Sequence, residues 1–185
     1  MQAYANIDPG IFLLSSLFGL MGCYLSYKRM QQSDWRQLHL YHTWLCIPMV
    51  FHFSLVSAWL AASLCLVGGI RTLILAGAWG QKHKKKVVFM CLCCPVFASL
   101  WTATHFIDWL LLCSTIIAVG AEGQNCMIRL RYASLVNAGL WVCNAFVFGA
   151  LMGVIFGLSS IFSNLKALSK QFNIRFFPRR IGVSP

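Results

Sequence analysis

Four long apolar runs alternate with short polar segments along the chain. A helix needs about 20 consecutive apolar residues to cross the hydrocarbon core of a bilayer. None of the runs shows the alternation of apolar and polar residues that is typical of a membrane β-barrel. The pattern therefore predicts an all-α integral membrane four-helix bundle, formed by one transmembrane domain over residues 1–185. The runs are Ile11–Tyr27, Trp44–Trp79, Val87–Val119 and Tyr132–Phe162.

The last three runs are longer than one crossing requires. Each covers more than 30 residues, and at ~1.5 Å per residue this is about 45 Å of helix or more. Such helices tilt, kink or project from the membrane, and Gly68-Gly69 and Pro95 are the expected kinks or ends. The four spans are expected at about residues 11–27, 44–70, 90–119 and 133–162.

The composition supports a membrane protein. Hydrophobic residues make up 59% of the chain and charged residues 10%, against about 45–50% and about 25% in soluble domains. This excludes most soluble folds and also a disordered chain, which requires low hydrophobicity. A basic nucleic-acid module places its charge on a polar surface, so we expect no nucleic-acid partner.

The positive charges predict an orientation, because short cytosolic loops are enriched in Lys and Arg. With four spans, one side carries nine of these residues, in the loop 80–86 and in the basic tail 164–185. The other side carries five. We therefore expect both termini in the cytosol, with the basic segments near anionic inner-leaflet lipids. The nine are Lys82, Lys84, Lys85, Lys86, Lys166, Lys170, Arg175, Arg179 and Arg180; the five are Lys28, Arg29, Arg36, Arg129 and Arg131.

Small residues recur every fourth position in two runs. Gly149, Gly153 and Gly157 share one helical face, which lets another helix approach closely. The first run has a similar stripe of Ser15, Gly19 and Cys23. These faces are expected inside the bundle or, alternatively, in a homo-oligomer or an interface with a membrane partner.

Four ionisable residues fall inside the long apolar runs, where such groups are costly and often functional. His105 and Asp108 are three residues apart and are expected to form either a proton-relay or ligand pair or a structural polar clamp between helices. Arg71 is expected to snorkel to the head groups. His52 and His105, on antiparallel spans, raise the alternative of a haem- or quinone-binding redox subunit.

Cysteine and histidine suggest further sites. Cys91, Cys93 and Cys94 follow the lysine loop and are candidates for S-acylation. Cys91 and Cys94 also form a C-x-x-C pair, as in thiol oxidoreductases, and Cys46 could pair with Cys126 in an oxidising compartment. A closed zinc site has four ligands. The helically spaced residues His39, His42 and Cys46 offer only three, so no metal is expected.

Three short stretches resemble the transmembrane protein 179 family, within the wider group of MARVEL-type four-span proteins. They are Arg71-Thr72-Leu73, the segment 114–120 with Cys126 just beyond it, and Gly139-Leu140-Trp141. Their order matches that family, whereas the second outer loop is shorter here. The resemblance implies a four-span architecture with cytosolic termini and implies no chemistry.

No catalytic motif such as a Walker loop, G-x-S-x-G or H-E-x-x-H occurs. We therefore expect a non-enzymatic accessory or membrane-organising subunit that acts through helix packing and lipid contact. The alternatives are the redox subunit and a small structural membrane protein of an enveloped virus. A channel or transporter is a further alternative, for which the sequence offers few polar residues.

Overall fold

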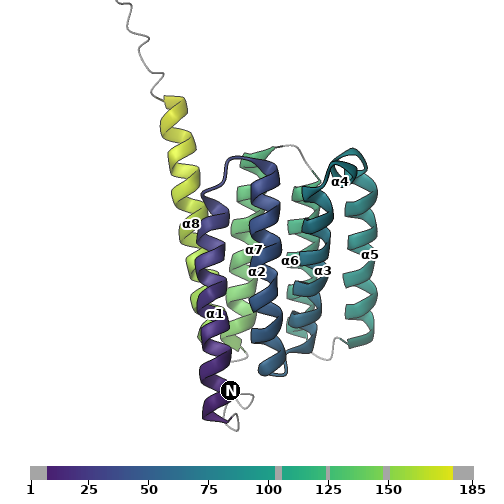
Figure 1. The fold of residues 1–185 in the computed structure, drawn as a ribbon, viewed down its shortest axis with the longest axis vertical. Helices are drawn as coiled ribbons and strands as arrows, with labels where there is room; N and C mark the ends of the chain where they lie inside the picture. Colours follow the sequence, from purple (N-terminus) through teal and green to yellow (C-terminus); the bar gives the residue numbers. More distant parts are fainter. Residues whose placement is uncertain (1–7, 103–105, 124–125, 148–150, 177–185) are drawn as a thin grey trace, which may run out of the picture.

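Helices account for all regular structure in the described part of the chain. The computed structural model describes residues 8–102, 106–123, 126–147 and 151–176. Seven long helices run side by side, and one short helix, α4, lies at one end of the bundle (Figure 1). The helices are α1 Pro9–Met30, α2 Trp35–Leu55, α3 Trp59–Ala76, α4 Ala78–Lys82, α5 Lys84–Thr102, α6 Phe106–Glu122, α7 Met127–Val147 and α8 Leu151–Phe176.

Local capping sets where the first two helices begin. Asp8 accepts hydrogen bonds from the backbone N–H groups of Gly10 and Ile11, and Pro9 occupies the first helical turn of α1. Asp34 accepts from the backbone N–H of Gln37 at the start of α2. Both acids satisfy donors that lack partners at a helix N-terminus. Two of the four acidic residues of the chain are thereby used as caps.

Each of the three longest apolar runs forms two helices instead of one span. The run expected to cross at 44–70 is divided between α2 and α3 by a turn at residues 56–58. Ser57 has a positive φ of 58° in this turn, a conformation that reverses the chain without a glycine. The run expected at 90–119 is divided between α5 and α6, and the run expected at 133–162 between α7 and α8.

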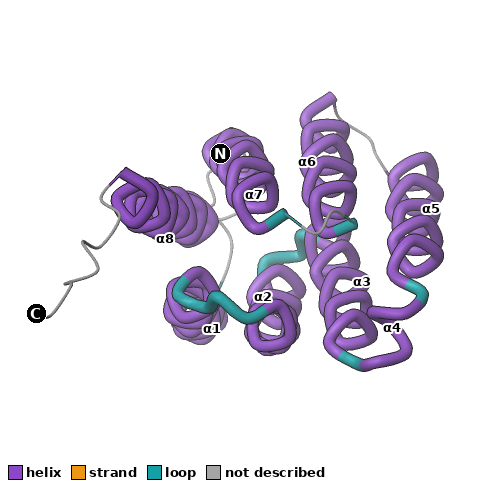
Figure 2. The backbone as a smooth tube through the Cα atoms, turned by 90° about the horizontal axis from the view of Figure 1, so that it is seen from above, coloured by secondary structure: helices purple, strands orange, loops and turns teal. Residues whose placement is uncertain are grey.

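The long helices form a closed ring made of two rows. Each helix packs against its neighbour along the chain, α3 packs against α5, and α8 closes the ring against α1. Seen along the bundle, α1, α2 and α3 form one row and α8, α7 and α6 the other (Figure 2). The helix α5 contacts both α3 and α6 and closes the far end.

Two glycines allow close helix contacts within the rows. A Cβ atom on Gly69 of α3 would lie 2.9 Å from the Cβ of Cys46 on α2. A Cβ atom on Gly157 of α8 would overlap Val142 of α7. Both positions therefore require a residue without a side chain, because real Cβ atoms do not approach that closely.

Large apolar side chains cover the outside of the ring. Leu13, Phe89, Phe146 and Phe162 are each more than 60% exposed. Exposed apolar surface on this scale is typical of a protein surrounded by lipid. The ring is thus apolar outside and, as described below, polar at its centre.

Three helical segments are both long and apolar enough to cross a membrane. They are Pro9–Met30, Trp59–Ala76 and Leu151–Lys170, while the apolar stretch Trp109–Glu122 is shorter. An all-helical membrane bundle therefore agrees with the sequence prediction. The predicted number of four spans is not confirmed.

A candidate solute-binding cavity

A cavity of about 110 Å³ lies between the two rows of helices. Side chains from α1, α2, α3, α6, α7 and α8 line it. A liquid water molecule occupies about 30 Å³, so the cavity has room for a few water molecules or a small solute. The cavity is therefore a central feature to which both rows contribute.

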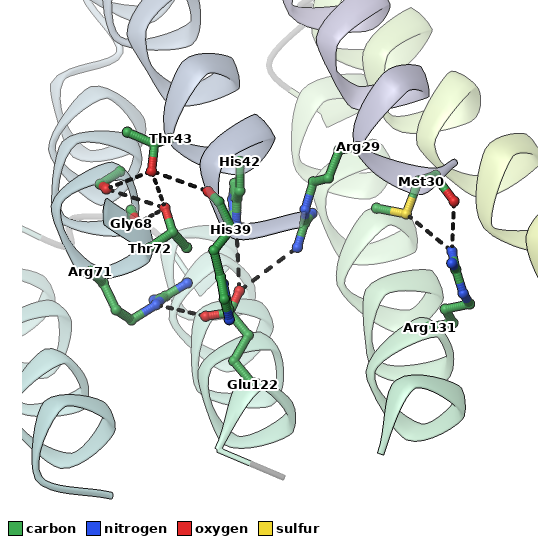
Figure 3. Close-up of polar contacts among 11 residues, drawn as sticks. Arg29, Met30, His39, His42, Thr43, Gly68, Arg71, Thr72, Glu122 and Arg131 are labelled. Atoms are coloured by element: carbon green, nitrogen blue, oxygen red, sulfur yellow. Dashed lines mark hydrogen bonds and ion pairs between the residues drawn. The ribbon is translucent and has the colours of Figure 1, made fainter. Parts of the chain in front are cut away.

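Three ionisable side chains surround the carboxylate of a fourth, Glu122, at one end of the cavity (Figure 3). Arg71 donates a hydrogen bond of 2.9 Å from Nε to Oε2 of Glu122. On the other oxygen, Oε1, an Arg29 Nη2 lies at 3.7 Å and the Nδ1 of His42 at 3.4 Å. The four residues come from α6, α3, α1 and α2 respectively, so this charged cluster joins both rows.

The charged cluster has more positive than negative charge and is shielded from outside. Two guanidinium groups face one carboxylate, and the Glu122 side chain is only 1% exposed. The Nε of Arg29 is buried with no hydrogen-bond partner among the described residues. Buried charges without full pairing are costly, and inside membranes they commonly mark solute or ion pathways.

The opposite end of the cavity is apolar and aromatic. Phe53 and Trp141 lie against each other there, with ring centroids 5.5 Å apart and ring planes tilted by 33°. Both belong to a core cluster with Met49, Leu64 and Phe156, and all five line the cavity. The cavity therefore has one charged end and one apolar end.

Polar uncharged side chains also line the cavity. Ser26 comes from α1, Thr115 from α6, and Ser134 and Asn137 from α7, while Ser160 comes from α8. Hydroxyl and amide groups both donate and accept hydrogen bonds. They give the centre of the ring a polar lining that a bundle packed only by apolar side chains would lack.

Hydrogen bonds between α2 and α3 support the charged cluster. The hydroxyl oxygens of Thr43 and Thr72 lie 3.0 Å apart, and Thr43 also donates to the carbonyl oxygen of His39. Thr43 and Thr72 follow His42 and Arg71 directly in sequence. The threonine pair thus fixes the two helices beside the residues that contact Glu122.

Arg131 of α7 fixes the end of α1. It donates from Nη1 to the carbonyl oxygen of Met30 at 3.0 Å and from Nη2 to that of Gln32 at 3.2 Å. Carbonyl groups at a helix C-terminus have no partner within the helix. Arg29 lies in the last turn of α1, so Arg131 also holds the segment that carries Arg29.

Of the expected intramembrane polar residues whose side chains the structure describes, Arg71 and His52, only Arg71 lies in this cluster. It pairs with Glu122 rather than reaching for head groups. His52 is buried on α2, and its Nδ1 lies 2.8 Å from the hydroxyl oxygen of Ser15. His105 lies outside the described residues. Asp108 is in the first turn of α6, and its side chain is outside the described part.

The residues expected to pack helices are divided between two hairpins. Gly153 and Gly157 are buried on α8, and Gly149 lies outside the described residues. On α1, Ser15 and Gly19 are buried, whereas Cys23 is partly exposed. A Cβ atom on Gly19 would lie 3.3 Å from Cβ of Met152, so α1 and α8 meet closely there.

The cysteines have no disulfide partner in the described part of the chain. Cys46 and Cys126 are both free, so the structure does not form the pair considered from the sequence. Cys91 and Cys93 are partly exposed on α5, and the side chain of Cys94 is outside the described part. Their S-acylation and the C-x-x-C chemistry remain predictions.

Sequence reasoning missed Glu122 and Arg29, and it considered His42 only as a metal ligand. Glu122 lies three residues beyond position 119, where the third span is expected to end, so it was not counted among the residues inside a span. A signal was available: the chain has four acids, two of them are helix caps, and one of the others follows an apolar run directly. An acid in that position requires basic partners.

Comparison with protein families gives a match over most of the chain. The model of a family named Imp-YgjV, described as "Bacterial inner membrane protein", matches residues 13–173. No curated protein and no solved structure matches the chain. The resemblance to MARVEL-type proteins and to the transmembrane protein 179 family is therefore wrong. It rested on short apolar stretches, which recur in unrelated membrane helices.

Proposed function

The chain belongs to the Imp-YgjV family of bacterial inner membrane proteins, and from this premise we propose that it transports a small solute through its central cavity. The observation that carries the proposal is the buried charged cluster at one end of a cavity lined by six helices. Ionisable groups in this position mark substrate and ion pathways in membrane proteins. A bundle that acts only by packing would fill this space with apolar side chains.

The proposal includes seven membrane crossings. The seven long helices contain between 17 and 26 residues, the range that spans a bilayer with variable tilt. Successive helices are joined by short segments and therefore run antiparallel. Seven crossings put the two termini on opposite sides of the membrane, unlike the four spans expected from sequence.

The distribution of basic residues supports this arrangement. In the described part of the chain, lysines and arginines lie towards the end of the bundle where α1 meets α2 and where α4 is located. No lysine or arginine occurs in the segments that begin the chain or connect helices at the other end. These segments are 1–8, 56–58, 103–105 and 148–150. With seven crossings the positive-inside rule puts the charged cluster at the cytosolic end and the N-terminus outside.

Cys65 provides a direct test, because its side chain lines the cavity. In a variant that keeps only Cys65, we expect labelling by a small membrane-impermeant methanethiosulfonate added to inverted inner-membrane vesicles. A variant that keeps only Cys113, which is exposed on the outside of α6, faces lipid and should label much more slowly. If neither Cys65 nor Cys113 is labelled to a measurable extent from either side of the membrane, the proposal is overturned.

Two other functions remain predictions. An accessory or membrane-organising role is compatible with the apolar exterior, but it does not account for the charged cluster. The redox alternative requires His52 and His105; the first is hydrogen-bonded to Ser15 and the second is outside the described residues. The family is bacterial, so a structural protein of an enveloped virus is not proposed.

A further inference from the structure

We infer that the solute is a short-chain monocarboxylate, whose carboxylate binds at Arg29 and Arg71 and whose apolar tail lies towards Phe53 and Trp141. This inference rests on the proposed transport function and specifies its substrate class. Three properties of the cavity carry it: its charge, its unpartnered donor, and the arrangement of polar and apolar ends.

The net charge of the cluster favours binding of a solute with one negative charge. Arg29 and Arg71 bring two positive charges, and Glu122 brings one negative charge. The buried Lys84 also acts electrostatically on Glu122. Among the four residues in direct contact, with His42 neutral, one positive charge is in excess. A bound monoanion neutralises that charge, whereas a cation increases it and a neutral solute leaves it uncompensated.

The donor groups select a carboxylate. A guanidinium group presents a planar fork of N–H donors that matches the two oxygens of a carboxylate. Arg71 uses its Nε on Glu122, but Arg29 is held only by a contact of 3.7 Å and its Nε has no partner among the described residues. Arg29 therefore has donor capacity at the wall of the cavity.

The size of the cavity and its apolar end favour a solute with a short apolar tail. At about 110 Å³, the cavity is smaller than the about 300–1,000 Å³ of pockets for drug-sized ligands. The Phe53–Trp141 pair lies at the end away from the charges and favours an apolar group over a second charge. Inorganic phosphate lacks such a group, and an amino acid would place an ammonium group beside two arginines.

The test measures protection of Cys65 in the single-cysteine variant. The rate of its reaction with methyl methanethiosulfonate, a small neutral reagent, is followed with matched probes: butyrate, butylammonium, 1-butanol, 2-aminobutyrate and inorganic phosphate. We expect saturating butyrate to slow labelling about tenfold or more, and the other probes to change it less than twofold. Hydrogen bonds to charged groups are worth about 1.5–3 kcal/mol, which corresponds to tenfold or more in affinity.

Substitutions at Arg71 provide matched variants. Arg71→Gln should abolish the protection by butyrate, and Arg71→Lys should keep part of it because charge remains without the planar fork. Glu122→Gln removes the carboxylate that competes for Arg71, so it should increase the apparent affinity for butyrate. Arg36→Gln, an exposed position at the start of α2, should leave protection unchanged.

The outcomes separate the inference from the proposed function. If Cys65 reacts but butylammonium or butanol protects as well as butyrate, the carboxylate assignment is overturned while the cavity remains accessible. If phosphate or 2-aminobutyrate protects best, the monocarboxylate is likewise replaced. If Cys65 reacts neither with this reagent nor with the membrane-impermeant methanethiosulfonate from either side, the transport proposal fails and the inference fails with it. Should Arg71→Gln not fold, the probe series on the parent variant and on Arg71→Lys decides.

Discussion

Arg71 and Glu122 are joined by a 2.9 Å hydrogen bond from Nε to Oε2, although 51 residues separate them in the sequence. The bond connects α3 in one row of the ring to α6 in the other (Figures 2 and 3). Both side chains are almost fully buried. The pair therefore holds the two rows in a fixed relation at the charged end of the cavity.

Removing one member of this pair should destabilise the protein strongly. Loss of one partner of a buried ion pair costs about 3–5 kcal/mol, because it leaves an uncompensated charge. We expect Arg71→Gln or Glu122→Gln each to lower the Tm in detergent by about 10 °C. The double variant should lose clearly less than the sum of the two, since either single substitution already breaks the same Arg71–Glu122 bond.

The exposed Arg36 is the matched control for this cycle. Arg36→Gln removes the same charge from the neighbouring helix and should change Tm by less than about 2 °C, as is usual for surface positions. Additive effects of Arg71→Gln and Glu122→Gln would contradict a direct interaction between the two side chains.

Cysteine labelling at two exposed serines distinguishes seven crossings from four. Ser33 lies between α1 and α2, and Ser57 lies between α2 and α3. In a cysteine-free background, Ser57→Cys should react with a membrane-impermeant maleimide from the periplasm. Ser33→Cys should react only after the inner membrane is opened.

The four-span prediction requires the opposite result. It places Ser33 in an outer loop and Ser57 inside the second span, so only Ser33→Cys would label from outside. That outcome would also move the basic residues near α1 and α2 to the periplasm. Both substitutions replace one small side chain by another, so folding should be unaffected.

The helical class of the fold was predictable, but the number of helices was not. Apolar runs of more than 30 residues indicated that something had to break them. The break at residues 56–58 has no glycine or proline and no charge; Ser57 takes the positive φ instead. A glycine or proline is the usual signal of a turn, and Pro48 lies inside α2 rather than at its end.

The candidate site was predictable only in part. Arg71 stood out because it interrupts an apolar run, but its partner depends on the ring that brings α3 near α6. His42 was noticed for its spacing from His39 and Cys46. Its actual neighbour, Glu122, is 80 positions away, and no local pattern reports contacts over that distance.

Two glycines in the α7–α8 hairpin should respond to alanine in opposite ways. A Cβ atom on Gly157 would overlap Val142, whereas a Cβ atom on Gly139 of α7 has nothing within 4 Å. Gly157→Ala should destabilise the protein by about 1–3 kcal/mol, the usual cost of overpacking. Gly139→Ala should be neutral or stabilise it by up to about 1 kcal/mol through helix propensity.

Thermal unfolding of the two purified variants checks this prediction. A fall of Tm for Gly157→Ala of about 2–4 °C per kcal/mol is expected for a chain of this length. Similar Tm values for both variants would show that α7 and α8 do not approach as closely as the structure has them.

Arg131 should control the order of the end of α1. Its Nη atoms donate to the carbonyl oxygens of Met30 and Gln32, and charge-assisted hydrogen bonds of this kind are worth about 1.5–3 kcal/mol. Arg131→Gln should therefore increase amide hydrogen exchange over residues 26–34, because α1 frays more readily. Exchange in the centre of α1 should not change.

This local effect has a consequence for the cavity. Arg29 lies one residue before Met30 in the last turn of α1, so fraying moves its guanidinium away from Glu122. If Arg29 contributes to carboxylate binding, Arg131→Gln should weaken protection of Cys65 by butyrate although Arg131 itself does not line the cavity. Faster exchange at residues 26–34 without weaker protection would mean that Arg71 alone binds the carboxylate.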